Sequence, residues 1–165
     1  MNELTTIDIK NSIDYRWRIH NAKVYLILWG IISGIVTIAL FIISAIDFSK
    51  DVFLINVYIW LGFVVVYGAV FGSFALYQFM QAKKLLKNFN NLKIYQAVLD
   101  TPSISYFYGR SVYYTVMLGT VTADTHPCFS NSVFSKFELS EYNNKTVRCL
   151  YDAENWQVYL IDIVQ

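Results

Sequence analysis

The chain has 165 residues, of which 56% are hydrophobic, 18% aromatic and only 15% charged, and its formal net charge is +1. With so little positive charge, the sequence carries no electrostatic footprint for nucleic acid. The length allows one ordinary domain or a membrane hairpin with a small extra module, and the clustering of apolar residues between 24 and 82 favours the second.

The N-terminal segment, residues 1–23, mixes apolar side chains such as Ile9 and Ile13 with charged ones such as Asp8 and Asp14. A short interfacial helix would have this composition, and so would a poorly ordered tail. The sequence alone does not decide between them. We expect this segment to lie in the cytoplasm, because basic residues precede the first apolar run.

Two uncharged runs follow, residues 24–46 and residues 52–82, separated by the short external loop 47–51. As helices rising about 1.5 Å per residue, both would cover the roughly 30 Å hydrocarbon layer of a bilayer. Helices are expected because lipid offers no partner to backbone N–H and C=O groups. The sequence therefore predicts a two-helix transmembrane hairpin. A buried hairpin of a soluble protein would need polar faces, and a signal peptide would have a shorter apolar region nearer the N-terminus.

Basic residues flank both outer ends of this hairpin. Arg16, Arg18 and Lys23 precede the first run. A second group of lysines follows the second run, comprising Lys83, Lys84 and Lys87. The loop 47–51 holds one lysine and two aspartates, so the positive-inside rule places both termini in the cytoplasm. The three later lysines are also candidate contacts for anionic lipid headgroups.

The C-terminal part changes pattern. Residues 83–92 keep a helical rhythm and are predicted to extend the second helix beyond the membrane. From residue 93 onward, short runs rich in β-branched and aromatic residues alternate with turn residues, which predicts strands. The expected strands are 94–98, 104–108, 111–122, 133–139, 145–151 and 156–163. The fold class is therefore membrane α + β, in which residues 93–165 form a cytoplasmic antiparallel β-barrel or β-sandwich that folds without the hairpin.

Three stretches of this module carry a family resemblance. They are Gly119-Thr120-Val121, Phe134-Ser135-Lys136-Phe137 and the block from Lys145 to Asn155 that includes Tyr151-Asp152. Over residues 93–163 the chain resembles the bacterial family called domain of unknown function 3592, whose members join membrane helices to a β module. The resemblance implies a bacterial origin and this architecture. It implies no established activity.

Small residues recur at helical spacing in both predicted spans. Gly30 and Gly34 form one GxxxG pair, and Gly68 and Gly72 form another at a corresponding depth. Such pairs let helix backbones approach closely in lipid, so the two pairs are expected to pack. Packing within one hairpin is the first interpretation. A contact in a homo-oligomer and the general enrichment of glycine in membrane helices remain open.

No catalytic, cofactor or metal site is predicted. Asp124, His126 and Cys128 alternate as strand ligands would, but Pro127 interrupts the strand and no second ligand pair supports a metal. Cys128 and Cys149 form no CxxC motif and are expected to be free thiols in the cytoplasm.

The tyrosine-rich segment 104–114 is the best candidate for a protein partner surface, because tyrosine and arginine are enriched at interfaces. Its members are Tyr106, Tyr108, Arg110 and Tyr113. A pair of core strands is the alternative interpretation. These features favour a non-enzymatic inner-membrane protein whose β domain binds a protein partner, with neutralisation of a toxin by a membrane-anchored immunity protein as one form of that hypothesis. The alternative is a subunit of a homo-oligomeric channel or a transport accessory protein.

Overall fold

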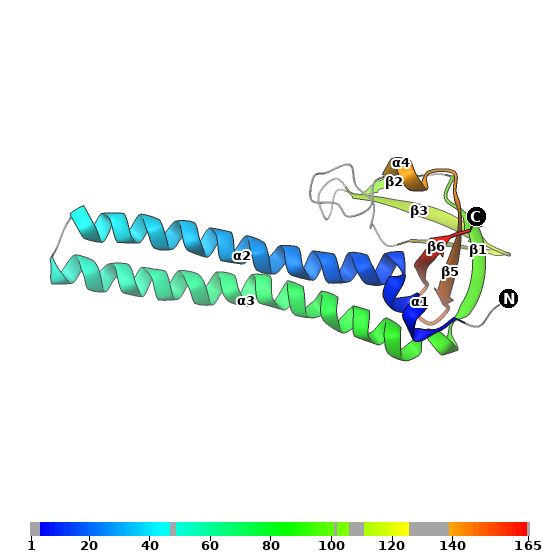
Figure 1. Ribbon diagram of the computed structural model, residues 1–165, viewed down its shortest axis with the longest axis horizontal. Helices are drawn as coiled ribbons and strands as arrows, with labels where there is room; N and C mark the ends of the chain where they lie inside the picture. Colours follow the sequence, from blue (N-terminus) through cyan, green and yellow to red (C-terminus); the bar gives the residue numbers. More distant parts are fainter. Residues whose placement is uncertain (1–3, 47–48, 101, 106–110, 126–138, 165) are drawn as a thin grey trace. The chain divides into compact units, whose positions relative to one another are not determined.

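The chain divides into two compact units (Figure 1). A computed structural model describes residues 4–46, 49–100, 102–105, 111–125 and 139–164. The first unit, called here the β unit, comprises residues 1–20 and 80–165, and the second, the hairpin unit, comprises residues 21–79. The β unit therefore joins the predicted 93–165 module to both the N-terminal segment and the end of the second long helix.

Two long helices form the hairpin, and Figure 1 shows them running antiparallel. Helix α2 spans Ile13–Ile46 and helix α3 spans Lys50–Asn88. Both are long and apolar enough to cross a membrane, and none of the apolar window of either helix is buried inside the protein. The helical hairpin expected from the uncharged runs is confirmed, and each helix extends beyond its run at the end away from the loop.

The N-terminal segment contains a short helix, α1, at Thr6–Asn11. Its first turn is fixed by a capping box, in which the Thr5 hydroxyl accepts from the Asp8 N–H while the Asp8 carboxylate accepts from the Thr5 N–H at 2.8 Å. Ser12 adopts an extended conformation and ends α1, and its hydroxyl then accepts from the Tyr15 N–H in the first turn of α2. The N-terminal segment therefore contains a short helix, and the structure does not test whether it lies at a membrane interface.

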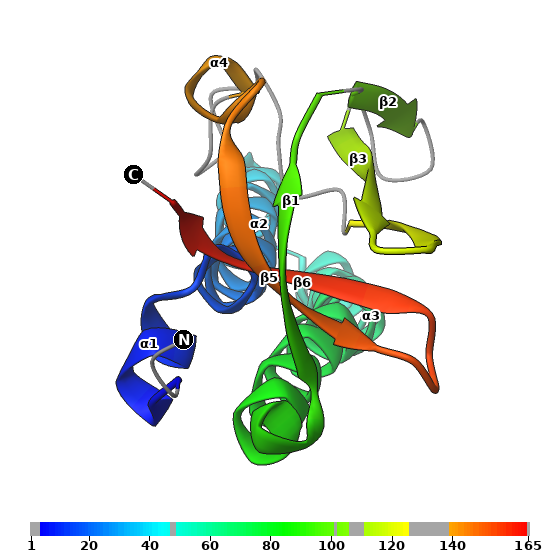
Figure 2. The same cartoon turned by 90° about the vertical axis from the view of Figure 1, so that its right-hand side faces the viewer.

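The first sheet has the strand order β1-β5-β6 and is antiparallel throughout (Figure 2). Strand β1 is Lys93–Val98, β5 is Thr146–Asp152 and β6 is Gln157–Ile163. Asp152 holds the tight turn between β5 and β6, because its carboxylate accepts from the N–H groups of Glu154 and Asn155. All three strands fall where alternating β-branched and aromatic residues predicted them.

The second sheet has the strand order β2-β3-β4. Strand β2 is Pro102–Ser105, β3 is Ser111–Leu118 and β4 is Val121–Asp124. The prediction of one strand over 111–122 is wrong, because the chain reverses at Gly119, whose φ of +69° suits the turn of a hairpin. The segment predicted as strand 133–139 lies outside the described residues except at its end, where helix α4 begins and covers Leu139–Tyr142.

Two apolar clusters hold the β unit together. One lies between the sheets and includes Tyr114 and Val116 from β3 with Cys149 and Leu160 from the first sheet. The other lies on the opposite face of the first sheet, where Leu150, Tyr159 and Ile161 meet Ile9 of α1 together with Leu85 and Phe89, and Phe89 opens the 3₁₀ turn Phe89–Asn91 after α3. The sheet is therefore buried on both faces, and helices supply one of the two covers.

Candidate functional site

The most unusual polar group of the β unit is the carboxylate of Asp14. It lies in the first turn of α2 and is fully buried. Its Oδ2 accepts a hydrogen bond of 2.6 Å from the backbone N–H of Leu160, beside an irregularity in the β5–β6 pairing. The Asp14 carboxylate thus binds the main chain of β6 at the edge of the sheet, in the place where a neighbouring strand would otherwise form hydrogen bonds.

Burial decides the protonation of this carboxyl. Burial raises the pKa of Asp14 to about 6, although the charge of Arg18 and the hydrogen bond from Leu160 both lower it. The second oxygen, Oδ1, makes no hydrogen bond to any residue in the described part of the chain, and Nη2 of Arg18 lies 3.9 Å from it. The pair is therefore loose, and the carboxyl titrates near neutral pH.

Arg18 completes this buried pair from one helical turn further along α2. Its guanidinium carbon lies 5.9 Å from the ring centroids of both Trp17 and Tyr159. Aromatic faces at this distance stabilise a cation that is removed from water. Sequence reasoning treated Arg18 as a flanking charge of the membrane span, whereas Arg16 and Lys23, with their exposed side chains, remain suited to that role. The i, i+4 spacing of Asp14 and Arg18 was the signal available in the sequence.

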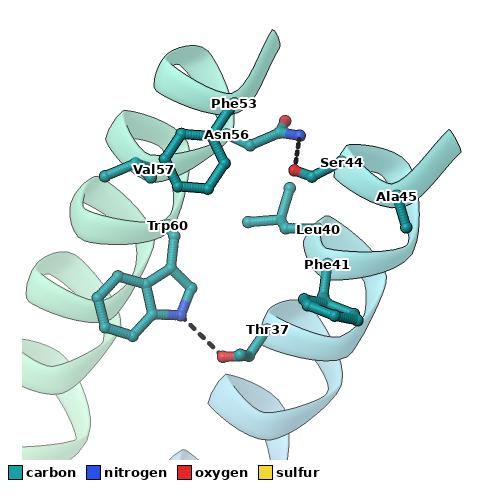
Figure 3. A pocket seen from close by; sticks show the side chains of 9 residues that line it. All are labelled: Thr37, Leu40, Phe41, Ser44, Ala45, Phe53, Asn56, Val57 and Trp60. Carbon is teal, nitrogen blue, oxygen red and sulfur yellow. Dashed lines mark hydrogen bonds between the residues drawn. The ribbon is translucent and has the colours of Figure 1, made fainter. Parts of the chain in front are cut away.

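The hairpin unit contains an apolar cavity of about 440 Å³ between α2 and α3 (Figure 3). Two hydrogen bonds cross it. Asn56 Nδ2 donates to Ser44 Oγ at 2.9 Å, and the Trp60 indole N–H donates to Thr37 Oγ1 at 2.8 Å. Figure 3 shows both bonds bridging the helices, with Leu40 pointing into the space between them. The cavity offers hydrocarbon walls, and its main polar groups already satisfy one another.

The four glycines predicted to pack the helices behave differently from one another. A Cβ atom at Gly68 would lie 3.3 Å from Nε1 of Trp29, so this glycine accommodates an indole ring of α2. A Cβ at Gly30, Gly34 or Gly72 would meet no atom within 4 Å. Within the hairpin unit, Gly68 therefore packs against a large side chain of the other helix, and the other three glycines have open space at the Cβ position.

The three lysines after the second run lie on the end of α3. Lys83, Lys84 and Lys87 are exposed, whereas Leu85 and Phe89 in the same segment are buried against the first sheet. The helical rhythm of this segment is thus explained by packing on one side and by solvation on the other. Their exposure leaves the lysine side chains accessible to charged groups such as lipid phosphates.

The predicted tyrosine surface lies mostly outside the described residues. Tyr106, Tyr108 and Arg110 lie outside the described residues. Tyr113 is half-buried on β3, opposite Ser103 of β2. The structure therefore places one of the four residues on a paired strand and leaves the proposed surface a prediction.

The cysteines and the alternating residues Asp124, His126 and Cys128 form no reactive site among the described residues. Cys149 is a free, buried thiol, and burial, with a smaller contribution from the charge of Asp14, raises its pKa to about 12. Cys128 and His126 lie outside the described residues, and Oδ1 of Asp124 accepts a hydrogen bond from the Thr115 hydroxyl. Among the residues that the structure describes, no group of three or more His, Cys, Asp or Glu side chains could hold a metal ion.

Comparison with known proteins identifies no relative. No protein-family model, no curated protein and no solved structure matches this chain.

Proposed function

We propose that the protein is a non-enzymatic, membrane-anchored binding module of a bacterial inner membrane. Helices α2 and α3 cross the bilayer, both termini lie in the cytoplasm, and the β unit binds a protein partner. The observation that carries the anchoring is the exposure of large apolar side chains on the hairpin unit, among them Ile38, Phe41 and Tyr58. In water such a surface would drive aggregation, whereas lipid is its natural solvent.

The character of the β unit supports binding over catalysis. The two described acidic groups of the β unit whose pKa values are raised, Asp14 and Cys149, are sealed from solvent and linked to the main chain of the sheet. Catalytic acids and nucleophiles must reach a substrate, so these groups are better suited to holding the fold. The two sheets, with one apolar cluster between them, fit a small β-sandwich that displays its outer surface to a partner.

Two narrower statements belong to the same proposal. The resemblance over residues 93–163 makes the chain a distant member of the domain of unknown function 3592 family. Neutralisation of a toxin is the form of partner binding that best suits a small anchored protein of this kind. The second statement predicts that a gene adjoining this one encodes the partner.

The test is to co-express the full chain with the product of the adjoining gene and to extract the membranes in mild detergent. The proposal predicts that the chain resists alkaline carbonate extraction and that native mass spectrometry finds a stable one-to-one complex. A chain released by carbonate would contradict the anchor. Absence of a complex with either neighbouring gene product would contradict the binding role in the form proposed.

One observation favours the alternative function, a homo-oligomeric channel subunit or transport accessory. The backbones at Gly30, Gly34 and Gly72 are not covered by any described residue, which leaves room for a helix of another copy. Disulfide cross-linking of Gly34→Cys in membranes, followed by conductance measurements on the reconstituted protein, separates the two. Cross-linked oligomers with unitary conductance would favour the channel.

A further inference from the structure

The part of helix α3 that belongs to the β unit has a basic side and a buried side. Lys83, Lys84 and Lys87 are exposed, and at about 100° per residue they fall within an arc of about 100° on the helix surface. Ala82 and Leu85 lie on the opposite side and are buried, and Leu85 packs in the apolar cluster on the first sheet. The helix end is therefore fixed to the β unit along one side, and its lysines are presented on the other.

These lysines have no acidic neighbour that would neutralise them. The sequence contains no Asp or Glu between Asp51 and Asp100. Among the described residues, no carboxylate lies within ion-pair distance of any of the three lysines. Lys83 and Lys87 are four residues apart, a spacing at which like charges on a helix repel each other. An anion bound from outside the chain would relieve this repulsion, so the basic side favours a negatively charged occupant.

The basic side becomes apolar about one turn before the lysines begin. Met80 lies within the same arc, and its side chain is 62% exposed. It belongs to the uncharged run 52–82, which is expected to lie in lipid. Lys83 to Lys87 lie about 4 to 11 Å beyond Met80 along the helix axis, which is close to the depth of a headgroup layer, about 5 to 8 Å. An anionic phospholipid, which joins hydrocarbon to phosphate, therefore fits this side better than free phosphate or an acidic protein segment.

We propose that Lys83, Lys84 and Lys87 form a binding surface for the headgroup of an anionic phospholipid, with Met80 against the upper part of its acyl chains. The bound lipid ties the β unit to the cytoplasmic leaflet. This inference rests on the proposed membrane anchor and adds a lipid preference to it. Because the selectivity is electrostatic, the surface prefers a lipid of net negative charge to a zwitterionic one, and salt weakens the preference.

The test uses the full chain in mild detergent, with phosphatidylglycerol and phosphatidylcholine of identical acyl chains as probes. Native mass spectrometry measures the apparent dissociation constant of each lipid. The wild type should bind phosphatidylglycerol at least about fivefold more tightly, and a higher ionic strength should reduce this preference. Soluble glycerophosphoglycerol, which has the same headgroup without acyl chains, should not compete at equal concentration.

Two double variants locate the preference. Lys83→Gln combined with Lys87→Gln removes two charges from the basic side, and glutamine keeps a high helix propensity. This variant should reduce the preference for phosphatidylglycerol to about twofold or less. Lys10→Gln combined with Lys145→Gln is the matched control, because it removes two exposed charges from other segments of the β unit. The control should keep the preference within about twofold of the wild type.

Equal affinity of the wild type for the two lipids would overturn the inference, as would equal losses of preference in the two double variants. Effective competition by glycerophosphoglycerol would also overturn it and would identify a free anion as the ligand. A Lys83 and Lys87 variant that loses the partner complex but keeps the lipid preference would assign the basic side to the partner. Release of the chain by carbonate would instead count against the proposed anchor.

Discussion

The hairpin unit and the β unit direct their apolar side chains in opposite senses. On the hairpin, Phe41 is 74% exposed and Tyr58 is 71% exposed, whereas Leu150 and Leu160 in the β unit are completely buried. Similar residue types therefore occupy opposite positions in one chain. The difference is the one expected if lipid surrounds the hairpin unit, as proposed above, and water surrounds the β unit.

Polar contacts differ between the units in the same way. In the hairpin, two neutral hydrogen bonds, Asn56 to Ser44 and Trp60 to Thr37, join the helices directly. In the β unit, a buried carboxyl binds the main chain of a distant strand. Neutral pairs are tolerated in a bilayer, where an ionised group is costly, whereas a globular interior can hold a charge when it is paired.

The largest expected difference between the units comes from truncating one leucine in each. Leu150→Ala removes a fully buried side chain of β5 on the helix-covered face of the first sheet. It should lower the free energy of unfolding of the β unit by about 2–5 kcal/mol. Leu54→Ala, at a position 52% exposed on the hairpin, is the control and should change it by less than about 0.5 kcal/mol. Hydrogen exchange of β5 and β6 amides in detergent measures the free energy of unfolding of the β unit in both variants. Equal decreases in the two variants would contradict the comparison.

Asp14 gives the β unit a pH dependence of a definite sign. Because the pKa of Asp14 is raised from 3.8 to about 6, the folded state favours the neutral form. The stabilising contribution is complete below about pH 4 and is lost as the pH rises to about 6, by up to about 3 kcal/mol. Asp14→Asn keeps an acceptor for the Leu160 N–H and should remove this dependence. Unfolding free energies at pH 4 and pH 7 test it, and parallel curves for the two proteins would show that Asp14 does not titrate here.

Substitutions at Gly68 and Gly34 test how the two helices of the hairpin pack. Gly68→Ile would push a side chain into the Trp29 indole and should destabilise the hairpin by about 1–3 kcal/mol. Gly34→Ile points into open space in a single chain and should have no such cost. Thermal unfolding in detergent measures the two variants. A loss at Gly34 that grows with protein concentration would instead show a contact between copies.

The smallest effect is expected at a surface ion pair of the β unit. Arg148 Nε donates to Asp162 Oδ1 at 2.7 Å, and both side chains are partly exposed. Asp162→Asn should lower the free energy of unfolding by at most about 1 kcal/mol, and added salt should reduce the difference. A larger, salt-independent loss measured by denaturant unfolding would mean that the pair supports the β5–β6 pairing itself.

Local sequence patterns were enough to predict the two long helices and the three strands of the first sheet. The uncharged runs predicted the hairpin because length and apolarity alone define such helices, and runs of β-branched and aromatic residues between turn residues predicted β1, β5 and β6. The β3–β4 reversal was missed although Gly119 interrupts the run, because an isolated glycine inside a strand pattern signals a bulge as readily as a turn. The prediction continued one strand across that glycine because the residues on both sides of it have high β propensity.

Contacts between distant segments could not be predicted in the same way. The hydrogen bond from Leu160 to Asp14 joins residues 146 positions apart, and no local pattern reports such a partner. The apolar side of the α3 extension was visible at Leu85 and Phe89, but the surface that it covers was not. We therefore expect a fragment of residues 93–165 to expose Leu150 and Ile161, and to be less soluble than the intact β unit.

Topology is the most direct test of the claim that the two units occupy different solvents. Alkaline phosphatase, which is active only outside the cytoplasm, is fused after Gln165 in one protein and inserted into the loop 47–51 in another. The account predicts no activity from the first and full activity from the second, because basic residues flank both outer ends of the hairpin. Activity from the fusion after Gln165, or inactivity of both fusions in stably expressed protein, would contradict it.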